Sequence, residues 1–213
     1  MSVHVCALAP RRPGPQPERT EGLRSARAPV DDPWDTMKQE DRTVISTLIV
    51  EMCREMFAAH GESFEELPQH QAAPERDSLL AASVGLSGPT VRGAMVVVAR
   101  PAFFFLTYPV ELGPPGAGDV ADWAGEVANQ LLGRMKNRLG RYGVDFTLST
   151  PTVVRGDRLQ LRSTLETVCI RHPLAIRDER IDVHFEIERE DDQPLLSNGP
   201  PATASAEGDT VLF

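Results

Sequence analysis

The chain has 213 residues, enough for one good-sized hydrophobic core or for one domain with tails. Its formal net charge of -9 disfavours general nucleic-acid binding, because displacing counterions from a nucleic acid requires a basic surface. No apolar run approaches the length of a membrane span, and the N-terminus lacks the apolar segment of a signal peptide. We therefore predict a cytoplasmic protein that binds neither nucleic acid nor membrane.

The three cysteines, Cys6, Cys53 and Cys169, are widely spaced and form no C-x-x-C pair. This spacing indicates a reducing compartment, and it predicts neither a disulfide framework nor a zinc site. The five histidines are scattered, and none belongs to an H-E-x-x-H motif. We expect the chain to hold no metal of its own.

Residues 1–38 are rich in proline, arginine and alanine and have no apolar period. Such a segment cannot bury enough surface to offset its ordering entropy, which predicts a disordered N-terminal tail. An open alternative is that Met37 is the native start, because the composition changes sharply there. The preceding residues would then be an upstream extension of the reading frame.

The first predicted helix covers about residues 40–60, with Asp41 as its N-cap and Gly61 as its C-cap. Apolar residues recur at helical spacing and predict its buried stripe: Val44, Ile45, Leu48, Ile49, Met52 and Met56. A polar loop follows. Two apolar runs, 79–86 and 91–99, are joined by Ser-Gly-Pro and predict a hairpin.

Residues 101–108 predict a short helix, with Phe103, Phe104 and Phe105 packing into the core. The Gly-Pro-Pro-Gly sequence of residues 113–116 interrupts the chain before the next element.

A second long helix is predicted over residues 119–139. Its apolar residues project onto one side: Val120, Ala124, Val127, Ala128, Leu131, Leu132, Met135 and Leu139. The opposite side carries Asp122, Glu126, Asn129, Gly133 and Asn137. An ordinary exposed face would carry Glu–Lys pairs and strong helix formers. A glycine within a helix costs about 1 kcal/mol relative to alanine. One reason to tolerate it is that the bare backbone lets another molecule approach closely.

After this helix the apolar period changes to two. It predicts strands at 144–149, 153–154, 159–161, 165–171 and 181–187, with turns at Gly156-Asp157 and near Asp178. We place the folded domain at residues 39–191 and predict a flexible C-terminal tail at 192–213. The order of elements predicts an α/β (α+β) sandwich, in which a mixed or antiparallel sheet packs against two long helices.

The second long helix carries a pattern that resembles the CheC/CheX/FliY family of chemotaxis phosphatases. The family signature is Asp or Ser, three residues, Glu, two residues, Asn, and a proline about twenty-two residues later. Here Asp122, Glu126 and Asn129 have this spacing, and Pro151 follows after 21 intervening residues, one short of the usual number. The first helix has Thr47, Glu51 and Arg54 at the corresponding positions, so its copy is degenerate, as in the single-site CheX branch. An i,i+3 surface pair of Glu51 with Arg54 is the simpler interpretation of those residues.

The resemblance implies a phosphatase that removes phosphate from the aspartate of a CheY-like response regulator. It assigns catalysis to Asn129 and Glu126: the carboxamide positions the attacking water, and the carboxylate pairs with a lysine of the regulator. The regulator itself supplies Mg²⁺. Partner contacts are expected from Asp122, Gln130, Gly133 and Asn137. Relatives of the single-site type form dimers by joining sheets, which implies a homodimer here.

Two alternatives stay open. The same fold occurs in flagellar switch components that bind a regulator without hydrolysing anything, and a fold does not dictate a function. A non-catalytic, CheX-like regulator-binding or scaffold module is therefore the second hypothesis, and an ordinary structural domain with an exposed helix is the third.

Overall fold

The computed structural model describes residues 39–68, 78–157, 159, 161, 168–189 and 195–196. The predicted N-terminal tail lies outside the described residues, as does the predicted C-terminal tail except for Leu195 and Leu196. None of the helices in the described part of the chain is long and apolar enough to cross a membrane.

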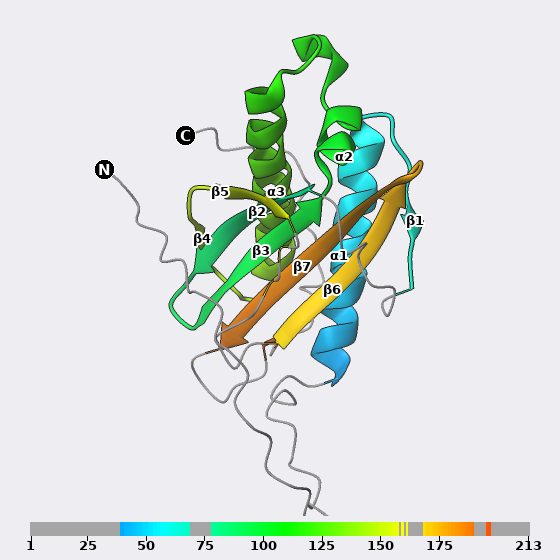
Figure 1. The fold of residues 1–213 in the computed structure, drawn as a ribbon. Helices are drawn as coiled ribbons and strands as arrows, with labels where there is room; N and C mark the ends of the chain where they lie inside the picture. The colour runs from blue at the N-terminus through cyan, green and yellow to red at the C-terminus, as the bar shows by residue number, and fades with distance from the viewer. Residues whose placement is uncertain are drawn as a thin grey trace, which may run out of the picture. The chain divides into compact units, whose positions relative to one another are not determined.

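Two long helices, α1 (Gln39–Ala59) and α3 (Ala117–Gly140), dominate the helical layer (Figure 1). Between them in sequence lie the short helix α2 (Pro101–Leu106) and the 3₁₀ turn η1 (Val110–Leu112). The strands are β1 (Glu65–Glu66), β2 (Ser78–Ser87), β3 (Val91–Ala99), β4 (Thr147–Leu148), β5 (Thr152–Asp157), β6 (Val168–Ile176) and β7 (Glu179–Arg189).

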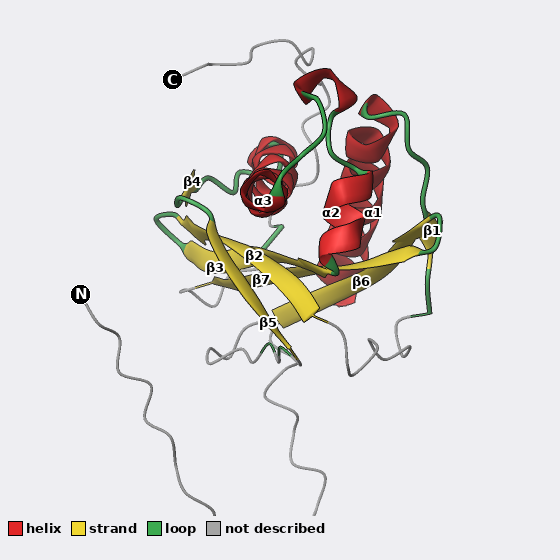
Figure 2. Cartoon of the chain, turned by 45° about the horizontal axis from the view of Figure 1, so that its top comes forward, coloured by secondary structure: helices red, strands yellow, loops and turns green. Residues whose placement is uncertain are grey.

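The strands form one sheet in the order β1-β6-β7-β3-β2-β4, and β5 pairs with β2 beside β4. Every pairing among the described strands is antiparallel. Figure 2 shows both long helices on the same face of this sheet. The α+β class and the two-helix layer predicted from the sequence are therefore confirmed, with the antiparallel pairing that was one of the two expected arrangements.

The hydrophobic core fills the space between the helices and the sheet. All eight apolar residues predicted for the buried side of α3 are buried. In α1, Ile45, Ile49, Met52 and Met56 are buried as predicted, whereas Val44 and Leu48 are only half-buried. The sheet contributes alternate side chains of its strands to this core, including Val84, Met95, Val97, Val183 and Phe185. This burial fixes the face that each helix turns to the sheet.

The predicted N-cap of α1 is wrong. The helix begins at Gln39, and Asp41 lies inside its first turn with only 6% of its surface exposed. Its carboxylate accepts the backbone N–H of Leu195 at 3.2 Å, and Leu195 itself is buried in the core. The packed chain thus reaches past residue 191, its predicted end. At the other end, Gly61 has a φ of 75°, the conformation expected of a helix C-cap glycine.

The short helix after β3 is confirmed, but Phe105 does not pack into the core. Phe103 and Phe104 are fully buried, while Phe105 is 57% exposed. A helix one and a half turns long can aim only part of its circumference inward, so three consecutive residues cannot all be buried on one side.

The C-terminal strands differ from their predicted limits. The strand predicted at 165–171 runs from Val168 to Ile176, so it continues through Pro173. In an antiparallel strand the N–H and C=O of one residue point to the same side. The Pro173 carbonyl accepts the N–H of Leu67, just beyond β1, so the missing N–H faces this short neighbour and costs β7 nothing.

The predicted turn at Gly156-Asp157 is also wrong, because both residues continue β5 and pair with Leu79 and Ser78. Residues 159 and 161 lie outside any strand. The turn near Asp178 is confirmed between β6 and β7, where Arg177 takes a φ of 54°.

Candidate functional site

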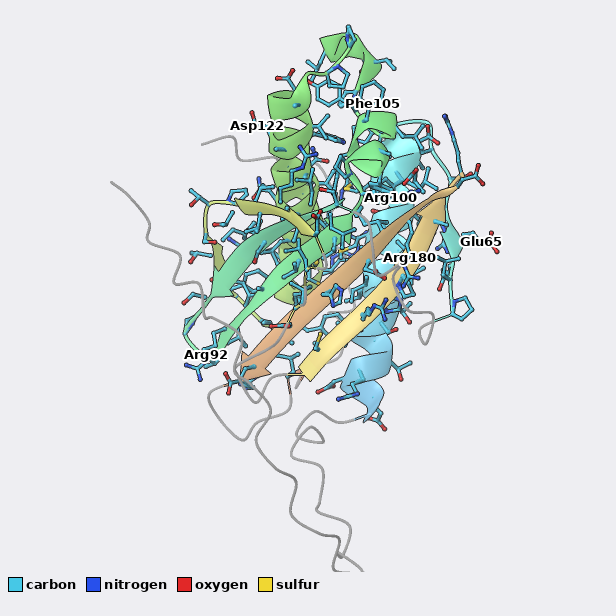
Figure 3. All side chains as sticks on the ribbon, in the orientation of Figure 1. Glu65, Arg92, Arg100, Phe105, Asp122 and Arg180 are labelled. Carbon is cyan, nitrogen blue, oxygen red and sulfur yellow. The ribbon has the colours of Figure 1, made fainter. Side chains whose placement is uncertain are left out.

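Helix α3 presents the candidate site on the side that faces away from the core. It begins after Gly116, whose N–H donates to the Asp119 carboxylate at 2.8 Å, which is one of the two bonds of a capping box. Asp122, Glu126 and Asn137 are exposed, and Asn129, Gln130 and Gly133 are half-buried. Figure 3 shows Asp122 near the N-terminal end of α3. The six predicted site residues therefore share the outer part of one helix.

Glu126 is held by a neighbour on the same helix. The Gln130 side-chain Nε2 donates to Glu126 Oε1 at 2.8 Å. Because residues four apart lie one above the other on a helix, this bond holds the carboxylate along the helix axis. It uses one of the two carboxylate oxygens, and each oxygen of an ionised carboxyl group can accept more than one bond.

Gly133 leaves the surface beside Asn129 open. A Cβ atom built on Gly133 meets no atom outside the helix's own backbone within 4 Å. Nothing in the described fold therefore requires glycine at this position for packing. The bare backbone lies one turn beyond Asn129, where a second molecule could approach the helix closely.

Pro151 lies against α3 at Gly125. A Cβ atom on the buried Gly125 would lie 3.3 Å from Pro151 Cβ and 3.4 Å from Val153 Cγ2. These two contacts place Pro151, the last residue of the sequence motif, beside the helical turn that connects Asp122 with Glu126. Sequence spacing gave Pro151 as part of the pattern, but it did not indicate that Gly125 receives it.

The segment that carries Pro151 is fastened to the β2–β3 hairpin. Ser149 Oγ accepts the N–H of Gly85 at 2.8 Å, and the Ser149 N–H donates to the Gly85 carbonyl at 2.9 Å. Thr147 Oγ1 donates to the Ser87 carbonyl at 3.1 Å. The hairpin thus holds one side of the segment, and α3 holds the other.

Side chains on the inner part of α3 fix the helix in place. Trp123 Nε1 donates to Thr107 Oγ1 at 3.2 Å, and the Trp123 ring meets His60 edge to face. Near the other end, Arg138 is 8% exposed and donates to Glu55 of α1 at 2.5 Å. This charge-assisted bond between Arg138 and Glu55 joins the two long helices.

The corresponding residues of α1 are engaged differently. Thr47, Glu51 and Arg54 are all exposed. Arg54 forms its ion pair with Glu66 of β1 at 3.7 Å, and its guanidinium lies 5.6 Å from the Phe64 ring centroid. The i,i+3 pair of Glu51 with Arg54 that the sequence suggested is therefore replaced by a contact with the edge of the sheet.

The cysteines of the described region are poorly suited to nucleophilic chemistry. Burial, with a smaller contribution from Glu66, raises the pKa of Cys53 to about 12. Cys169 is exposed at its surface, and partial desolvation of its thiol together with the nearby Glu186 raises its pKa to about 11. Since the thiolate is the nucleophilic form, both remain thiols at neutral pH. The described residues contain no group of three or more His, Cys, Asp or Glu side chains arranged to hold a metal ion.

Comparison with known proteins finds similarity to one protein family. The family model described as "Chemotaxis phosphatase CheX" matches residues 80–174, which include α3 and Pro151. No curated protein sequence matches the chain significantly.

Solved structures share the fold at low sequence identity. The chemotaxis protein CheX from Vibrio vulnificus is 19% identical, with a TM-score of 0.58, covering 66% of this chain and 97% of that one. CheX from Desulfovibrio desulfuricans is 21% identical, with a TM-score of 0.57 and coverages of 68% and 99%. The Borrelia burgdorferi protein in a CheX–CheY–BeF₃–Mg²⁺ complex is 14% identical, with a TM-score of 0.52 and coverages of 71% and 98%.

The antiparallel sheet and its two long helices give this chain the fold of the solved CheX structures. The chain is similar to the CheX family over residues 80–174, which are less than half of its length.

Proposed function

We propose that this protein hydrolyses the acyl phosphate of a phosphorylated, CheY-like response regulator in the cytoplasm. The observation that carries the proposal is the outer part of α3. A carboxylate and a carboxamide lie there about one helical turn apart, beside Pro151 and next to the open backbone of Gly133. This surface can enter a partner's active site, because its groups stand on a rigid helix and not on a loop.

The chemistry needs little from the enzyme beyond positioning. An aspartyl phosphate is already activated, so the barrier lies largely in placing a water molecule in line with phosphorus and stabilising the developing charge. The Asn129 carboxamide suits this task, because its oxygen can accept a hydrogen bond from the water while its NH₂ donates to a phosphoryl oxygen. We assign the positioning of the attacking water to Asn129.

Glu126 has the role of aligning the two proteins. It lies one turn before Asn129, and Gln130 holds it along the helix axis. A carboxylate fixed in this way can pair with a lysine at the rim of the regulator's site. Asp122, Gln130 and Asn137 complete the contact surface, and Gly133 lets the regulator's loops approach.

The metal belongs to the regulator in this proposal. Mg²⁺ bound there neutralises charge on the transferred phosphoryl group. The CheX relative from Borrelia burgdorferi supports this arrangement, since its complex contains CheY, the phosphoryl mimic BeF₃ and Mg²⁺ together.

The test is phosphate release from a phosphorylated response regulator of the same organism. Asn129→Ala should lower the catalysed rate by about 100-fold, the usual cost of losing a precise positioning group, while binding is retained. Glu126→Ala should raise KM about tenfold, which corresponds to about 1.4 kcal/mol. Glu51→Ala and Arg54→Ala change the matching positions of α1 and serve as controls that should leave the kinetics unchanged.

Two results would refute the proposal in different ways. Normal turnover by Asn129→Ala would remove that residue from the mechanism. If the unaltered protein binds phosphorylated regulators but accelerates the loss of phosphate from none of them, the protein is the non-catalytic binding module.

A further inference from the structure

An apolar groove of about 450 Å³ opens beside the N-terminal end of α3. Its walls are Pro101 and Phe105 of α2, Ala117 and Ala121 of α3, and Leu80 and Val153 of the sheet. Arg155 of β5 also lines it and is the charged residue among the described lining. Phe105 is 57% exposed, so a large aromatic side chain stands at the groove's edge in contact with solvent. Figure 3 shows Phe105 close to the end of α3 that carries Asp122.

The groove is continuous with the polar surface of α3. Ala121, in its wall, directly precedes Asp122 in the helix. Val153, in its opposite wall, contacts the Gly125 position together with Pro151. At 100° per residue, Gly125 lies between Ala121 and the line of Asp122 and Asn129 around the helix. A molecule that contacts Asn129 and Pro151 therefore reaches the mouth of the groove without crossing another element.

The polar surface alone is too small for a stable protein contact. A specific interface of ordinary size buries about 800 Å² on each partner and has an apolar centre. Six residues on one helix, most of them polar, supply only part of that area and none of the apolar centre. Toward the C-terminal end of α3 the contact would extend to the polar residues Arg134 and Lys136, whereas toward the N-terminal end it extends to the groove.

We infer that the groove is the second half of the regulator's docking surface, and that it takes an apolar side chain of the receiver domain whose phosphoaspartate faces Asn129. The inference rests on the proposed function. In this arrangement the polar residues around Asn129 take part in the hydrolysis, and the apolar groove at the N-terminal end of the same helix supplies binding affinity. An aromatic residue beside a preformed apolar depression is the kind of surface on which binding energy concentrates.

The test measures binding and turnover separately. Phe105→Asp places a charge at the exposed edge of the groove, and Ala121→Gln fills it from α3. Each should weaken binding to the BeF₃-activated regulator at least about tenfold, with little change in the rate of phosphate loss at saturating protein. Leu112→Asp is the matched control, because Leu112 is 68% exposed on η1 and does not line the groove. Its affinity should equal that of the unaltered protein.

The possible failures can be told apart. If the unaltered protein accelerates dephosphorylation and both groove variants bind as it does, the groove inference is overturned and the proposed function stands. Regulator binding that is groove-dependent but gives no phosphate loss overturns the catalytic proposal and supports the groove. A change in the oligomeric state of the groove variants by sedimentation, without regulator present, would identify a second copy of the chain as the occupant. Restored regulator affinity in those variants after removal of residues 1–36 would identify the N-terminal segment instead, and either outcome overturns the inference.

Discussion

The contact between Gly125 and Pro151 makes a quantitative prediction for Gly125→Ala. In a helix interior, replacing glycine by alanine should stabilise the fold by about 1 kcal/mol. At this position the new Cβ would lie 3.3 Å from Pro151 Cβ, closer than carbon atoms normally approach, and 3.4 Å from Val153 Cγ2, at the near limit of ordinary contact. Overpacking of this kind costs about 1–3 kcal/mol, so the net change in the free energy of unfolding should lie between about zero and a loss of 2 kcal/mol.

Gly133→Ala supplies the reference, because its Cβ meets no atom outside the helix's own backbone within 4 Å. That variant should gain the full 1 kcal/mol or so of helix propensity. Urea unfolding of both variants gives the comparison, with the midpoint changing and the m-value constant. Equal stabilisation by the two substitutions would refute the argument, since it would mean that Pro151 and Val153 do not resist the added methyl group.

A double-mutant cycle assigns the cost to its cause. Pro151→Gly removes the Cβ atom that the methyl group added at position 125 would meet, so the penalty of Gly125→Ala should shrink in its presence. In the Gly125→Ala protein, the added methyl group should push Pro151 away from α3. This should lower turnover, because Pro151 flanks the helical turn between Asp122 and Glu126. An unaltered catalytic rate in a Gly125→Ala protein that shows the stability penalty would separate Pro151 from the chemistry.

Two further predictions concern stability. Asp41→Ala removes the acceptor of the buried Leu195 N–H and should cost about 1–2 kcal/mol in urea unfolding, whereas Asp41→Asn keeps an acceptor oxygen and should cost less; equal losses would mean that the bond contributes nothing. Burial lowers the pKa of His184 to about 4, against the smaller opposing effect of Asp182 and in the same direction as Arg171. The unfolded chain then binds the proton more readily than the folded one, so stability should fall as pH drops from about 6.5 to 4, and His184→Gln should flatten this dependence. An unchanged pH profile in that variant would assign the slope to other groups.

Local patterns explain how much of the fold the sequence could predict. Helix α3 was predictable because its eight apolar residues repeat at helical spacing. All eight are buried on the one side of the helix that faces the core. The limits of β5 and β6 were not, because Gly156 and Pro173 are turn or break residues in isolation. Each is tolerated through the pairing of its strand, which the sequence does not display.

The candidate site divides in the same way. The exposed set on α3 follows from periodicity alone. The contacts that hold α3 in place join residues distant in sequence. Arg138 bonds to Glu55 of α1, and Pro151 packs at Gly125. Their pairing depends on how the helices and the β4–β5 segment meet in three dimensions. Phe105 was wrongly predicted to be buried. Its apolar side chain suggests a core position, but its place on a short helix leaves it exposed.

The two borders of the sheet differ in what they offer to another strand. On one border β1 is two residues long, and Pro173 of β6 presents no N–H beside it. On the other, β2 is covered in two pieces, β4 and β5, with Ser149, Thr150 and Pro151 between them. Among the described residues, β5 offers six consecutive residues at this border, whereas β6 on the other border has no described neighbour over residues 168–172. If two copies of the chain join their sheets at β5, the partner copy would lie beside Pro151. Self-association and access to α3 would then compete for the same border, so the state of assembly would set how much of the site is open.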